Sequence, residues 1–256
     1  MPLVNVLINS TTAGVGSSNV RKGNAPPPIF LDYLVVGGGS YGTTIAGGGG
    51  GVVSGSIRFL PRFNLDVTVG NGGTGSTAIA AGASIIESLP NEFFVYAGGG
   101  DGGVSGEPQS NPAGGDTNYS HGGAGGSAQA GQDPPTINKG GAGGSGSVWL
   151  DGNAYAGGGG GYGAAIIANQ AIGGDGGFGG GGMGEGYTSG PAYGLANTGG
   201  GGGGTRFAPS TNGGSGIVKL RYLSGSVSGA IGGTIQTTGS YTYHIFTGSG
   251  QFVYQP

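Results

Sequence analysis

The sequence contains no cysteine and few charged side chains. Its 256 residues include 8 Lys and Arg and 11 Asp and Glu, which gives a net charge of −3. Without cysteine there is no disulfide, no thiol nucleophile and no cysteine-type zinc site. The low charge argues against nucleic acid as a partner, because neither a basic surface nor a strongly acidic tail is present.

Long apolar runs are also missing from the sequence. No stretch has the length of apolar residues that a membrane span needs. The N-terminal residues lack the basic and apolar pattern of a secretory signal, so a protein that works outside a cell would have to leave it by another route, such as lysis.

Glycine is the residue that the sequence has in excess, with 71 of 256 positions. An average globular chain has about 7% glycine. The 35% content of hydrophobic residues, together with the low charge, argues against disorder. Collagen is excluded because the glycines stand in consecutive runs and not at every third position. The sequence therefore predicts a folded protein with an unusual interior.

The glycine runs predict that the main chain itself forms this interior. Glycine buries no side chain and loses much backbone entropy on folding, so long runs destabilise a fold unless their backbones pack together. The extended helix with three residues per turn leaves every N–H and C=O group for a neighbour. The predicted fold class is mainly irregular and β: a bundle, or sandwich, of polyglycine II helices flanked by short β-strands, with a small C-terminal β module. The alternative is that the runs are flexible loops between strands.

The chain divides into three predicted parts. Residues 1–30 read as an N-terminal arm or attachment segment, residues 31–223 as the glycine-rich polyglycine II domain, and residues 224–256 as the C-terminal β module. Strands are predicted at residues 32–36, twice within 52–70, and at 217–222, with a turn at Gly239 and Ser240 near the C-terminus.

No catalytic or cofactor motif stands out. Gly37, Gly39 and Gly42 match the glycine spacing of a dinucleotide-binding loop, but no helix follows them, so we expect no nucleotide cofactor. His121 and His244 have no acidic or hydroxyl partner in a defensible constellation, so we expect no enzyme activity. Aspartates beside the glycine runs do not have calcium-loop spacing, and no metal site is predicted, although a bound calcium ion stays an alternative.

The aromatic residues suggest a recognition surface. If successive glycine segments cross the molecule in alternating directions, loops of one parity emerge together at one end. One set of loops is 104–120, 147–156 and 183–198; the other is 127–139, 164–172 and 205–212. The first set holds five Tyr and Trp residues, whereas the second holds only Phe207. Tyr and Trp offer rigid contact area with a polar tip, which suits recognition. The alternative is that these rings cover the flanks of the bundle.

Several segments resemble a known family. DYLVVGGGSYG, AGGGGGYG, NTGGGGGG and GGSGIVKLRY are similar, in this order, to the glycine-rich domain of bacteriophage tail-fibre proteins and of some bacterial surface proteins. The resemblance covers about residues 31–223. The arrangement also looks like the tip adhesins of T-even-like phage fibres, in which packed polyglycine II helices present loops that bind a receptor on the host.

The resemblance implies a non-enzymatic virion protein that mediates adhesion to a host surface receptor, either an outer-membrane protein or a polysaccharide. Other tail-fibre or virion proteins are the expected assembly partners, and the protein is expected in the extracellular virion, made in the host cytoplasm without a signal peptide. The candidate receptor-binding residues are Tyr119, His121, Trp149, Tyr155, Tyr187 and Tyr193.

Two other functions are compatible with this sequence. A capsid decoration or fibre-shaft subunit would use the same scaffold without binding a receptor. An ice-binding surface would need regular rows of Thr or Ala, which the irregular loops do not supply.

Overall fold

The computed structural model describes most of the chain between Ile29 and Tyr254. The described ranges are 29–59, 64–75, 79–88, 93–101, 122–136, 138–164, 170–227 and 229–254. The predicted N-terminal arm, residues 1–30, lies outside them except for its last two residues, which begin the first strand.

Twelve strands lie in the described residues. Their bounds are β1 Ile29–Val36, β2 Val52–Phe59, β3 Asn64–Thr68, β4 Ser84–Ser88, β5 Phe94–Ala97, β6 Ser147–Val148, β7 Ala154–Tyr155, β8 Ile217–Leu223, β9 Ala230–Ile231, β10 Thr234–Thr238, β11 Tyr241–Phe246 and β12 Gly250–Tyr254. The strands predicted at 32–36, within 52–70 and at 217–222 correspond to β1, β2, β3 and β8.

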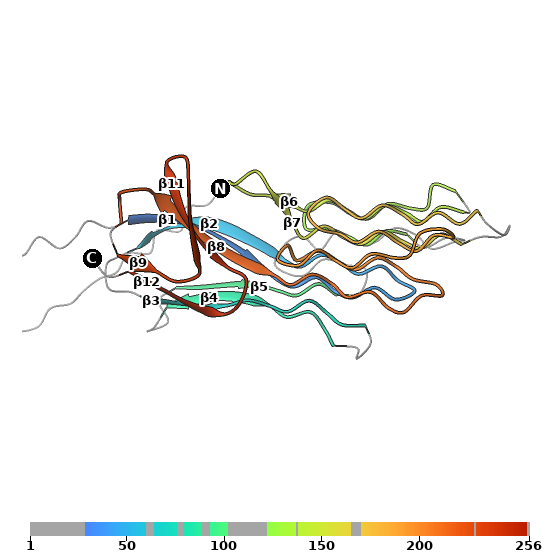
Figure 1. The fold of residues 1–256 in the computed structure, drawn as a ribbon, viewed down its shortest axis with the longest axis horizontal. Helices are drawn as coiled ribbons and strands as arrows, with labels where there is room; N and C mark the ends of the chain where they lie inside the picture. The colour runs from blue at the N-terminus through green and yellow to red at the C-terminus, as the bar shows by residue number, and fades with distance from the viewer. Residues whose placement is uncertain are drawn as a thin grey trace, which may run out of the picture.

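The strands form two five-stranded antiparallel sheets and one small hairpin. The first sheet has the order β10-β11-β8-β1-β2, and the second has the order β5-β4-β3-β12-β9. Strands β6 and β7 pair only with each other. Figure 1 shows both sheets at one end of an elongated molecule, from which the glycine-rich segments extend along the long axis.

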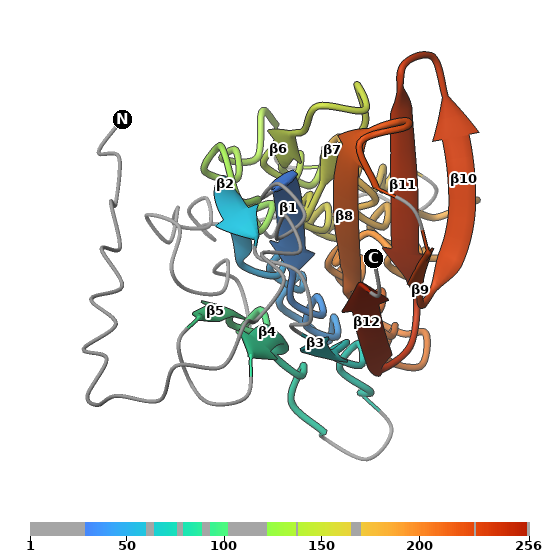
Figure 2. The same cartoon turned by 90° about the vertical axis from the view of Figure 1, so that its left-hand side faces the viewer.

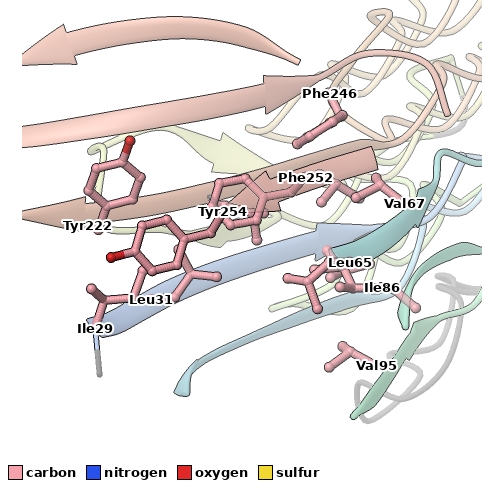
Figure 3. Close-up of a cluster of buried hydrophobic side chains, with 14 residues drawn as sticks. Ile29, Leu31, Leu65, Val67, Ile86, Val95, Tyr222, Phe246, Phe252 and Tyr254 are labelled. Atoms are coloured by element: carbon pink, nitrogen blue, oxygen red, sulfur yellow. The ribbon is translucent and has the colours of Figure 1, made fainter. Parts of the chain in front are cut away.

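The main hydrophobic core lies between the two sheets. Alternation along β1 sends Leu31 and Val35 into this core, while Leu34 and Val36 point to the opposite face of the same sheet. The second sheet contributes side chains such as Leu65, and Figure 3 shows the cluster between the sheets. On the opposite face, the β6–β7 hairpin covers the first sheet with a second, smaller core.

The C-terminal residues supply strands to both sheets. Strand β11 pairs with β8, and β12 pairs with β3. The predicted turn at Gly239 and Ser240 joins β10 to β11. The strands within the predicted C-terminal β module, residues 224–256, complete the two sheets and bury Phe246 and Phe252 in their common core.

The glycine-rich segments are joined to one another by backbone hydrogen bonds with a three-residue repeat. In the central segment 157–163, successive N–H groups point to three different neighbours, and in two of the three rows every third N–H returns to the same neighbour. The N–H groups of Gly157, Gly160 and Gly163 donate to the oxygens of Gly179, Gly182 and Glu185, those of Gly158 and Gly161 to Gly144 and Gly141, and that of Gly159 to Gly47. These bonds measure 2.9–3.0 Å, as in ordinary secondary structure.

The same segments approach so closely that a side chain has no room. A Cβ atom placed on Gly160 would lie 2.0 Å from the carbonyl oxygen of Gly174, and one on Gly201 would lie 1.8 Å from that of Gly47. The obstructing atoms belong to the backbone and cannot rotate away. Glycine is therefore required at these positions by packing, and not by an unusual backbone dihedral.

Outer segments need glycine only where they face the bundle. The run around Gly131 and the run around Gly194 contain few glycines, yet a Cβ on either residue would lie 2.0 Å or less from a backbone oxygen. Their neighbours Gln132 and Tyr193 are exposed. Backbone bonds from Gln132 to Ala142 and from Gly194 to Asn212 place both runs within the bundle. Non-glycine residues thus mark the solvent side of the bundle.

Candidate functional site

The end of the molecule farthest from the sheets consists of turns, which we call the distal tip. It comprises the turns at 43–45, 186–189 and 205–210 together with residues 171–172, at the right-hand end of Figure 1. Backbone bonds connect the turns: the N–H of Thr205 donates to Thr43 and that of Tyr187 donates to Ala171. The tip is therefore a single surface built from segments far apart in sequence.

Glu185 fixes the most prominent turn of the distal tip. Its Oε2 atom accepts hydrogen bonds from three consecutive N–H groups, those of Arg206 at 2.6 Å, Phe207 at 3.0 Å and Ala208 at 3.1 Å. The Glu185 N–H in turn donates to Gly204 within the bundle. One carboxylate thus ties the turn to the scaffold.

The charge of Glu185 suits this role. Partial burial would raise the pKa of its carboxyl, but the three N–H donors and the Arg206 charge hold the pKa below its ordinary value. The carboxylate is therefore ionised at neutral pH, when its hydrogen bonds to the turn are strongest.

Large apolar side chains stand exposed on the distal tip. Phe207 is the most exposed, at 82%, and the Arg206 guanidinium lies 4.8 Å from the centre of its ring. The other large apolar side chains exposed here are Ile45, Ile172 and Tyr187. A rigid turn that holds an aromatic ring in water is a feature of binding surfaces, because hiding that ring requires a partner.

The predicted site residues fall into three groups. Tyr119 and His121 lie outside the described residues. Tyr187 lies on the distal tip, and Tyr193 is exposed on the outer segment next to Gly194, at 59% and 64% respectively. Trp149 and Tyr155 are buried under the β6–β7 hairpin. The structure therefore does not bring the described members together on one face.

Trp149 and Tyr155 have structural contacts in place of exposed rings. The Tyr155 hydroxyl donates to Asp151 at 2.7 Å, and Lys219 Nζ of β8 donates to both groups. Burial and the Asp151 hydrogen bond raise the pKa of Tyr155. Arg221 lies 5.8 Å from the Trp149 ring. These contacts attach the hairpin to the first sheet. The interpretation of Trp149 and Tyr155 as recognition residues is therefore corrected, because both rings are buried between the hairpin and that sheet.

The loop geometry expected from the sequence is also corrected. The range 127–139 is not one loop. Its first residues form a turn beside β6, where Ser127 contacts Ser147. The residues that follow, such as Gln132, form a segment that crosses the bundle. The range 183–198 likewise contains a distal turn, an outer crossing segment and a turn beside the sheets. Counting only glycine-dense blocks missed these crossings, because outer segments need few glycines.

Glu185, Arg206 and Phe207 were not identified from the sequence as site residues. Phe207 was noted only as the single aromatic residue of the second loop set. A usable signal was present: Glu185 is a lone acid within glycine, and TRFAPS is a short non-glycine insertion between two glycine runs. Their contact across 20 residues of chain could not be read from spacing alone.

No grouping of three His, Asp or Glu side chains able to hold a metal ion occurs among the described residues. Within the same ranges, the structure has no helix of the length and apolarity needed to cross a membrane.

Comparison with known proteins gives one match. The family model described as a glycine-rich domain matches residues 13–223, which is most of the chain. Neither the curated proteins nor the solved structures gave a significant match. The chain belongs to the glycine-rich domain family.

Proposed function

We propose that this protein is a bacteriophage tail-fibre or fibre-tip protein that adheres to a receptor on the host surface through its distal tip. Its glycine-rich segments would be polyglycine II helices, which form the rigid scaffold. The three-residue hydrogen-bond repeat supports this part of the proposal, because that helix has three residues per turn and no internal bonds.

The single observation that carries the adhesive role is the fixed exposure of Phe207. Its turn is held by three hydrogen bonds to Glu185, so little entropy is lost when a partner covers the ring. Tyr187, Ile45 and Ile172 add apolar area on the same end. We assign assembly with other virion proteins to the sheets at the other end. An outer-membrane protein or a polysaccharide remains the proposed receptor.

The test is binding of the fluorescently labelled full chain to a panel of bacterial cells. Replacing Phe207 and Tyr187 together by Ser is expected to weaken binding at least about 30-fold, since even one central aromatic residue of an interface contributes about 2 kcal/mol. The matched control is Phe178→Ser, which removes an exposed ring of the turn beside the sheets.

The two outcomes separate adhesion from a purely structural role. Loss of binding in the tip variant, with binding retained in Phe178→Ser, supports adhesion through the tip. Equal binding of the tip variant and the wild-type chain, or no binding of the wild-type chain to any cell of the panel, would contradict it and favour a virion subunit without a receptor.

A further inference from the structure

Strand β10 forms an open edge of the first sheet. It pairs with β11 on one side and is the last strand in the sheet order. All five residues, Thr234, Ile235, Gln236, Thr237 and Thr238, are exposed. Figure 2 shows β10 at the outer side of the sheet, with no described segment beyond it.

The other edges of the two sheets are short or charged. Strand β9 has two residues and β5 has four, while β2 carries the exposed Arg58. Natural proteins protect sheet edges by such means, because an edge offers unpaired N–H and C=O groups to any other strand. Strand β10 has five residues, no charge and no proline. It is therefore the edge best suited to receive another strand.

The sequence of β10 suits pairing with itself. TIQTT is nearly symmetric about Gln236, so antiparallel pairing of two copies would place Gln236 opposite Gln236 and Thr234 opposite Thr238. Thr pairs across strands are favourable, and no like charges would meet. We propose that a second copy of this chain pairs with β10 across a two-fold axis at Gln236, which joins the two first sheets into one.

The pairing would also cover exposed apolar side chains. Ile235 lies opposite His244 in the β10–β11 register, on the face that looks toward the second sheet, and is 51% exposed. Ile231 of β9 is 57% exposed and is joined to β10 through Gly232 and Gly233. In the two-fold dimer, Ile235 lies opposite Thr237 of the other copy. This buried apolar area adds to the stability that the backbone hydrogen bonds give the dimer. The proposed dimer does not depend on the proposed receptor function.

The test is the molar mass of the full chain in solution, measured by sedimentation over a range of concentrations at low salt. The wild-type chain is expected to form a dimer. Gln236→Lys and Gln236→Glu each place like charges opposite each other on the axis and are expected to weaken the dimer at least about tenfold. An equal mixture of the two variants is expected to restore it, because Lys then faces Glu.

The control is Thr68→Lys. Thr68 is exposed on β3, which lies inside the second sheet between β4 and β12 and is therefore not an edge strand. This variant is expected to dimerise like the wild-type chain. The inference is overturned by a wild-type chain that stays monomeric at several hundred micromolar, or by Gln236 variants that dimerise as well as the wild type. A mixture of Gln236→Lys and Gln236→Glu that stays monomeric would also overturn the inference, because the proposed pairing places the two opposite charges next to each other on the axis.

Discussion

Gly160→Ala is expected to destabilise the protein strongly. The new methyl group would lie 2.0 Å from the carbonyl oxygen of Gly174, so two neighbouring segments must separate. That separation breaks several backbone hydrogen bonds, among them those of Gly160 to Gly182 and of Gly174 to Gly161. Overpacking and lost bonds together are expected to cost at least about 3 kcal/mol, from a typical total of about 5–15 kcal/mol. Urea denaturation followed by circular dichroism and tryptophan fluorescence measures the change.

Gly190→Ala is the matched control for this substitution. It lies in the same glycine-rich part of the chain, but a Cβ atom there would meet no atom within 4 Å. We expect its free energy of unfolding to stay within about 0.5 kcal/mol of the wild-type value, or to rise slightly because alanine restricts the unfolded chain. Similar stabilities for the two variants would mean that the segments do not pack as described.

Asp151→Ala is expected to destabilise the protein by about 3 kcal/mol. Asp151 and Lys219 form an ion pair of 2.8 Å, and both side chains are only 12% exposed. Burial alone would raise the pKa of Asp151, but the hydrogen bonds from Lys219 and Tyr155 hold it below its ordinary value. Removing the carboxylate leaves the Lys219 ammonium largely buried without its anion, which is the costly step for buried pairs. Thermal and urea unfolding measure the loss.

The double variant Asp151→Ala with Lys219→Met separates the pair from general packing. Because it removes both charges and keeps most of the lysine volume, it is expected to recover part of the loss. Lys219→Met alone should be less harmful than Asp151→Ala, since Tyr155 and Asn153 still donate to Asp151. Additive effects of the two substitutions would show that Asp151 and Lys219 do not interact.

The sequence predicted the strands and the glycine segments better than it predicted the site. Alternating or β-branched runs such as IVKLRY are local signals, and they correspond to strands in the structure. The dense glycine runs are local signals as well, because an inner segment contacts neighbours on every side and therefore needs glycine at each position. Residues 157–160 show this most clearly.

The site could not be predicted because it depends on which segments are neighbours. Glu185 and Phe207 meet through two adjacent crossings, and glycine density does not reveal every crossing, because outer runs such as 190–195 contain few glycines. Trp149 and Tyr155 lie in a short segment with a single glycine, Gly152, which in sequence resembles an exposed loop. Only the pairing of that hairpin over β1 and β8 shows why its rings are buried.

Amide hydrogen exchange of the glycine segments tests the central claim most directly. If the backbones of residues 156–163 form the interior, the N–H groups of Gly158 to Gly161 are expected to exchange more slowly than in an unfolded chain by on the order of a thousandfold or more. The exposed Gly248 serves as the fast reference within the same protein. NMR of the chain labelled with ¹⁵N-glycine follows both. Exchange of Gly158 to Gly161 at the rate of Gly248 would contradict a hydrogen-bonded glycine interior.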